Sequence, residues 1–137
     1  MNVQSVYSLL ILSVLLAGCN NNSAITRFYD KTLKKEKLAC ISYTPESNNT
    51  LNLELTKLYS FNKNCPNKLT LTYKSNIVCN SPYNKDKKLS GDFPTAYITL
   101  EVRSNFKLRY SYYKDLTSSA KISDLKDAFD RLKEDIL

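Results

Sequence analysis

The chain has 137 residues and a formal net charge of +7, all of which falls on residues 19–137 because residues 1–18 carry no charged side chain. Hydrophobic residues at 42% and charged residues at 24% are typical of a globular domain and exclude a disordered or collagen-like chain. The absence of histidine excludes Ser/His/Asp and Cys/His catalytic pairs and HExxH zinc sites. With only two glycines, a glycine-rich phosphate loop is excluded as well.

The N-terminus carries an export signal. Residues 6–17 form an apolar run that is too short to cross a bilayer as a helix. The run ends in Leu15-Leu16-Ala17-Gly18-Cys19, which resembles the lipobox of bacterial lipoproteins. That resemblance implies cleavage before Cys19, its acylation, and anchoring to a membrane through lipid; the alternative is an ordinary signal peptide with an unmodified Cys19. By resemblance to enteric lipoprotein sorting, Asn20 implies the outer membrane, with the protein facing the periplasm.

The sequence divides into four predicted segments. Residues 1–18 are the signal peptide, and residues 19–37 are a tether followed by a charged lead-in without a clear period. Residues 38–116 alternate in the manner of β-strands, and residues 117–137 switch to a helical period. We therefore expect one β-domain with a C-terminal helix.

The first half of the β-domain is predicted to contain short strands separated by turns. Residues 37–43 are rich in β-formers, and Leu51, Leu53 and Leu55 alternate with polar residues, which predicts a second strand with a bulge before Leu58. Residues 69–73 alternate strictly, residues 77–79 form a short apolar stretch, and residues 80–93 form the longest predicted loop.

The clearest signal is a predicted hairpin in the second half. Two alternating runs, 96–103 and 106–113, flank Ser104-Asn105 and predict an antiparallel hairpin with one buried face. Phe106, Leu108, Tyr110 and Tyr112 are assigned to that buried face. Tyr97 and Tyr113 fall on the opposite, outward-facing side of the hairpin, where they suit a binding face or a cross-strand tyrosine pair.

The C-terminal segment is predicted to be an amphipathic helix with Ser119 or Ser123 as its N-cap. Its apolar stripe, which suits either the chain's own core or a partner, consists of Ile122, Leu125, Phe129, Leu132 and Ile136. Regularly spaced strands followed by one helix predict a mainly β fold, a small antiparallel β-sandwich with an appended helix.

If Cys19 is acylated, three cysteines remain in an oxidising compartment, so one disulfide and one spare thiol are expected. We predict pairing of Cys40 with Cys79, which would join an early strand to a mid-chain strand; Cys65 with Cys79 is the alternative.

Catalytic chemistry has little support in the sequence. Glu54 and Glu101 are candidates for a glycosidase-like acid pair, but each occupies the polar parity of its predicted strand, where a solvated carboxylate is the ordinary interpretation. We expect no enzyme activity, no cofactor, no metal site and no small-molecule substrate. The basic clusters at 34–37 and 85–88 favour an acidic partner over nucleic acid, because an exported lipoprotein rarely meets nucleic acid. The candidate partners are the inner leaflet of the outer membrane, a polyanionic glycan and an acidic protein; the ordinary interpretation is charge that keeps the protein soluble.

The lipobox, the strand-borne cysteine in Leu38-Ala39-Cys40-Ile41 and the cysteine in Ile77-Val78-Cys79 resemble a loose group of small bacterial lipoproteins. Some members have immunoglobulin-like sandwiches, and some are described as periplasmic immunity lipoproteins of type VI secretion systems. The resemblance implies an immunoglobulin-like sandwich and assigns no functional residue except Cys19. The leading hypothesis is a lipid-anchored, non-enzymatic envelope binding protein, specifically an immunity protein that neutralises a periplasmic toxin. The alternatives are an accessory or structural lipoprotein of a secretion or pilus assembly, and a surface adhesin.

Overall fold

The computed structural model describes residues 24–78 and 93–137. The predicted signal peptide, Cys19, Cys79 and nearly all of the predicted 80–93 loop lie outside these residues.

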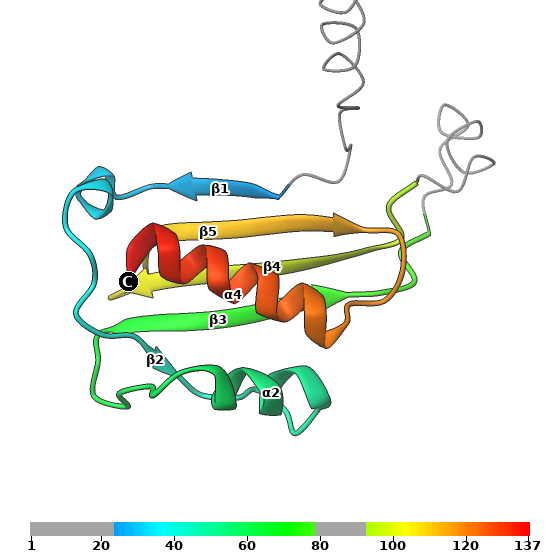
Figure 1. The fold of residues 1–137 in the computed structure, drawn as a ribbon, viewed down its shortest axis with the longest axis horizontal. Helices are drawn as coiled ribbons and strands as arrows, with labels where there is room; N and C mark the ends of the chain where they lie inside the picture. The colour runs from blue at the N-terminus through cyan, green and yellow to red at the C-terminus, as the bar shows by residue number, and fades with distance from the viewer. Residues whose placement is uncertain (1–23, 79–92) are drawn as a thin grey trace, which may run out of the picture.

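The described residues form one mixed five-stranded sheet, with one helix packed across one of its faces and a second helix beside the edge of the sheet, against the first helix (Figure 1). The strands lie in the order β1-β5-β4-β3-β2; only β2 and β3 are parallel, and the other pairs are antiparallel. Their bounds are β1 Ile25–Phe28, β2 Ser42–Tyr43, β3 Asn67–Lys74, β4 Ala96–Ser104 and β5 Lys107–Leu116. The helices are the short 3-10 helix η2 Lys31–Lys34 and the α-helices α2 Thr50–Leu58 and α4 Ile122–Ile136.

The predicted sandwich is not confirmed, although the fold is mostly antiparallel β with a C-terminal helix, as expected. A sandwich needs a second sheet over the buried face, and in the described part of the chain α4 lies over that face instead, with α2 packed against α4 at the β2 edge (Figure 1). The lead-in also contributes to the sheet, because β1 pairs with β5 from Ile25↔Tyr113 to Phe28↔Tyr110. The sheet therefore begins before residue 38.

The predicted strand over residues 51–58 is wrong, because this segment is helix α2. Leu51 and Leu55 are buried and Leu58 is half-buried, at the i, i+4, i+7 spacing of one helix face, whereas Leu53 is 44% exposed. The side chain of Asn49 caps the helix by accepting a hydrogen bond from the Asn52 amide at 3.0 Å. The leucines of this segment thus fit both the two-residue period of a strand and the period of a helix. The Asn49 cap favours the helix.

The predicted hairpin is confirmed as β4 and β5, but its turn is displaced by one residue. Asn105 and Phe106 form the two-residue turn with φ values of 47° and 69°, and Phe106 is 98% exposed rather than buried. Such turns favour glycine at positive φ, so a phenylalanine there costs about 1 kcal/mol in backbone strain. A register shift opposite Val102 and Arg103 leaves Arg109 without a Cα partner, and it moves Leu108 off the buried face.

Helix α4 is confirmed, and its apolar stripe packs on the chain's own sheet rather than on a partner. Leu125, Phe129, Leu132 and Ile136 are at most 1% exposed, while Ile122 at the helix start is 37% exposed. Neither predicted serine caps the helix: Lys121 occupies the N-cap, and its backbone amide donates to the Asp124 carboxylate at 3.0 Å.

Candidate functional site

One face of the sheet, which no described helix covers and which we call the open face, carries a stacked pair of tyrosines. Tyr97 on β4 and Tyr113 on β5 are diagonal neighbours, since Tyr113 pairs with Thr99 and Tyr97 pairs with Asp115. Their ring centroids are 5.7 Å apart with an interplanar angle of 25°. The structure therefore brings together the two tyrosines that the alternation assigned to the outward face, and packs them against each other.

A carboxylate holds one of these rings in place. The Tyr113 hydroxyl donates to Asp115 Oδ1 at 2.6 Å, and this hydrogen bond raises the pKa of Tyr113 to about 12. Tyr113 is therefore a neutral phenol at physiological pH, and its hydroxyl hydrogen is committed to Asp115. The stacked pair is pre-organised rather than free to rotate, which lowers the entropy cost of covering it.

The tyrosine pair borders a half-open depression with a volume of about 560 Å³. Its wall extends from β1 across β5 and β4 to β3, and it includes Ile25, Arg27, Tyr29, Thr72, Glu101 and Ser111. Ile25 and Tyr29 are 49% and 50% exposed, so apolar area is available at the β1 side. This wide mixture of apolar, hydroxyl and charged groups suits a protein surface better than a small molecule, which is normally enclosed.

The same face carries an excess of basic side chains. Glu101 is engaged by Arg103, whose Nε and Nη2 lie 3.1 Å and 2.9 Å from Oε2. The register places Lys68 and Lys74 of β3 on this face, opposite Arg103 and Tyr97, and Arg27 also lines the depression. Four basic side chains against two carboxylates, Glu101 and Asp115, leave the described part of this face with a net positive charge, which favours an acidic partner.

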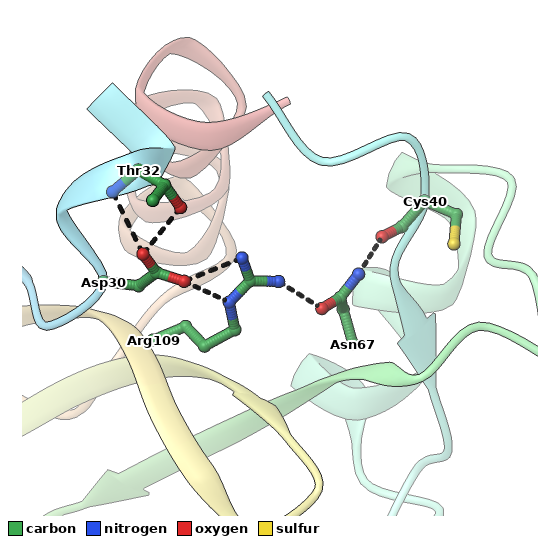
Figure 2. A network of polar contacts seen from close by, with 5 residues as sticks. All are labelled: Asp30, Thr32, Cys40, Asn67 and Arg109. Atoms are coloured by element: carbon green, nitrogen blue, oxygen red, sulfur yellow. Dashed lines mark hydrogen bonds and ion pairs between the residues drawn. The ribbon is translucent and has the colours of Figure 1, made fainter. Parts of the chain in front are cut away.

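Arg109 joins three distant parts of the chain (Figure 2). Its Nε and Nη2 donate to Asp30 Oδ2 at 3.0 Å and 2.8 Å, and its Nη1 donates to Asn67 Oδ1 at 2.8 Å. Asn67 Nδ2 in turn donates to the Cys40 carbonyl at 3.3 Å, and Asp30 accepts from the backbone amide and hydroxyl of Thr32. These hydrogen bonds, with those to Thr32 first, lower the pKa of Asp30 to about 2. We call these five residues the Arg109 network.

The Arg109 network fixes the β1 side of the open face. The Arg109 carbonyl also accepts hydrogen bonds from the backbone amides of Tyr29 and Asp30, at 2.9 Å and 3.1 Å. Arg109, the residue at the bulge, therefore binds the end of β1 through both its main chain and its side chain. Each side chain that forms the network has a hydrogen-bond partner within the chain, so the network fixes the position of β1 relative to β5 and β3. Sequence reasoning missed it, because Arg109 is 79 residues from Asp30 and 42 from Asn67.

The disulfide prediction requires a correction. Cys40 bonds to Cys65, with 6.0 Å between their Cα atoms, and not to Cys79. The reason is topological: β2 follows Cys40 and lies parallel to β3, so the residues just before these two strands come side by side. Cys79 and Cys19, the predicted acylation site, lie outside the described residues.

The candidate acid pair is not assembled. Glu54 lies on α2, where it pairs with Lys57 at 3.1 Å, while Glu101 lies on the uncovered sheet face with Arg103. The sheet separates the two carboxylates, so the geometry does not provide the facing acids of a glycosidase. Among residues 24–78 and 93–137, no group of three or more Cys, Asp or Glu is arranged to hold a metal ion.

Comparison with known proteins yields no relative: no family model matches the chain, and neither a curated protein nor a solved structure is significantly similar to it. In the part of the chain that the structure describes, no helix has the length and apolarity required to span a bilayer.

Proposed function

We propose that this protein is a lipid-anchored, non-enzymatic binding protein of the bacterial envelope, and that its open sheet face binds an acidic protein. The observation that carries the proposal is the stacked Tyr97–Tyr113 pair on an uncovered face with excess basic charge. Of the forms such a protein takes, we favour an immunity protein that covers the active site of a periplasmic toxin.

The physical case for the face combines area, order and charge. Tyrosines give large contact area with only two rotatable side-chain bonds, and they are enriched in the centres of protein interfaces. Tyr97 and Tyr113 are ordered before binding by their stacking and by Asp115. Arg27, Lys68 and Lys74 around them would attract an acidic surface and speed its encounter.

The N-terminal sequence supports the location. Acylation of Cys19 would anchor the chain without a spanning helix, and the Asn20 signal favours the outer membrane with the domain in the periplasm. Five residues lie between Cys19 and Ile25, so the tether would reach about 20 Å at most. The sheet would therefore stay close to the bilayer.

The alternative, an accessory lipoprotein of a secretion or pilus assembly, has less support. It relied on α4 as a docking helix, and the apolar stripe of α4 is used in the protein's own core.

The test is a pull-down of the full-length protein from its own envelope, comparing wild type with a Tyr97→Ser/Tyr113→Ser double variant. Leu53→Asn, which removes an exposed apolar side chain on α2, is the matched control. We expect one stoichiometric acidic partner with wild type and the control, and its loss with the double variant. A set of assembly subunits that persists in the double variant would contradict the proposal.

The anchor is tested separately with a fatty-acid probe on wild type and Cys19→Ser. We expect label on the wild type only, and membrane release of Cys19→Ser. Equal membrane association without label would overturn the localisation.

A further inference from the structure

We propose that the β4–β5 hairpin tip is a second contact point, in which Phe106 inserts into an apolar pocket with an acidic rim on the protein partner. This inference rests on the proposed function, since it concerns the same partner. It adds a site at the end of the domain, separate from the stacked tyrosines.

Phe106 is the most exposed large hydrophobic residue among those described, at 98%. It occupies a turn position with a φ of 69°, where glycine is the favoured residue and a bulky side chain is strained. The fold gains no packing from this ring, so folding alone favours glycine over phenylalanine at this position. Backbone strain at a bulky residue that gives nothing to the core points to a contact outside the chain.

The turn that presents Phe106 is held rigidly. The Arg103 Nη1 donates to the Phe106 carbonyl at 3.4 Å, and the same guanidinium is bonded to Glu101. Ser104 and Lys107 close the ladder on either side of the turn. A projecting aromatic ring on a turn that is held at its backbone suits an interface anchor, because the side chain has only two rotatable bonds to order when it enters a pocket.

The charge around the tip selects the partner's chemistry. Lys107 is exposed beside Phe106, and Lys68 is exposed on β3 opposite Arg103. Three further exposed lysines, Lys31, Lys34 and Lys35, lie in and after η2, at the end of the molecule where β4 ends (Figure 1). The only carboxylate in β4, Glu101, is engaged by Arg103. Glu36 and Glu134 are exposed at the same end of the molecule. In the strands next to the turn, however, Arg103, Lys107 and Lys68 outnumber Glu101, so the charge beside the ring is net positive and the complementary rim is acidic.

The position of the tip favours a protein over the membrane as its binding partner. The chain enters the sheet at Ile25, opposite Tyr113, and β1 runs from there toward the hairpin turn (Figure 1). From Tyr113 to Lys107 the strand advances about 20 Å, so the tip lies at the end of the sheet away from the tether. An anchor at Cys19 therefore leaves the tip directed to the periplasm.

The first experiment places the photo-crosslinker p-benzoylphenylalanine at position 106 of the full-length protein in its native bacterium, with positions 53 and 97 in parallel. We expect one discrete protein adduct from 106 and from 97, none from 53, and a mapped contact peptide rich in apolar and acidic residues. Replacing Lys107 or Lys68 with Glu should reduce the adduct from 106, whereas Lys126→Glu on the exposed side of α4 should not.

The second experiment uses the purified pair identified in this way. Phe106→Gly should weaken binding roughly tenfold or more while its unfolding midpoint stays at or above that of wild type, because glycine suits the turn. Val78→Ser, which removes an apolar residue that is 76% exposed, should change neither value.

The outcomes separate the two proposals. A lipid adduct from 106, an adduct with a second copy of the chain, no adduct beyond the control, or unchanged binding of Phe106→Gly each overturns the inference. If position 97 still crosslinks to an acidic protein, the proposed function survives that result; if neither position does, both fail.

Discussion

Arg109 and Asp30, 79 residues apart, share a two-pronged ion pair in which Nε and Nη2 both reach Oδ2, at 3.0 Å and 2.8 Å. The pair joins the bulge of β5 to the end of β1, and it therefore determines where the β1 side of the open face lies.

The Arg109–Asp30 pair predicts an acid-sensitive contribution to stability. The pKa of Asp30 falls from 3.8 to about 2 on folding, so its contribution is complete above pH 3.8 and is lost as the pH falls toward 2. Asp30→Asn should lower the urea midpoint at neutral pH. It should also make the fall of the urea midpoint between pH 3.8 and about pH 2 shallower than in wild type. Glu36→Gln, an exposed carboxylate nearby, is the control, and an equal effect of the two variants would contradict the assignment.

Ionisation of buried tyrosines predicts alkaline unfolding. Burial, together with the hydrogen bond to Asp135 at 2.9 Å, raises the pKa of Tyr110 far above 10.0, and burial raises that of Tyr43 to about 12. Because the folded-state pKa is raised, the stabilisation is complete below pH 10.0 and is lost as the pH rises above it. Phenolate absorbance should therefore appear for these residues together with loss of the circular dichroism signal of the fold. Tyr110→Phe should cost about 1 kcal/mol at neutral pH, and phenolate formation before unfolding would argue against this account.

The Cys40–Cys65 bond predicts a reductant-sensitive fold. It closes a loop of 25 residues, which on the chain-entropy model stabilises by about 3.5 kcal/mol. Peptide mapping without reductant should recover the Cys40–Cys65 pair, and reductant should lower the urea midpoint. The sensitivity should persist in Cys79→Ser; recovery of a peptide containing Cys79 in disulfide linkage with Cys40 would contradict the pairing.

The core position of α4 predicts that the helix is required for folding. Phe129→Ala should reduce the unfolding free energy by about 3–5 kcal/mol, since the ring is 1% exposed. Ile122→Ala on the same stripe should cost much less, because Ile122 is 37% exposed. Deletion of residues 123–137 should abolish cooperative unfolding, and a folded truncated domain would show that α4 is dispensable.

The parts of the fold that could be predicted are those whose sequence period was unambiguous. The alternation over 96–113 and the 3.6-residue period of the last segment gave β4, β5 and α4, and with them the outward position of Tyr97 and Tyr113. Residues 51–58 fitted both periods, and only the Asn49 cap distinguishes them. Strand β1 was too short to carry a period of its own.

Other features depended on topology, which a single sequence does not reveal. The partner of Cys40 follows from the parallel pairing of β2 with β3. The Arg109 network follows from a bulge that no local signal marks, and the bulge also removed Leu108 from the buried face. The exposure of Phe106 follows from a one-residue displacement of the turn.

The sheet ends in two short strands, four residues in β1 and two in β2, while the three between them have eight to ten residues. Unpaired strand edges are where chains add to one another, and a short edge offers few backbone groups for such growth. Lipid anchoring would concentrate this protein in two dimensions, where neighbouring copies collide often. Short edges would then protect a crowded membrane surface from aggregation, and binding would be left to side chains rather than to strand addition.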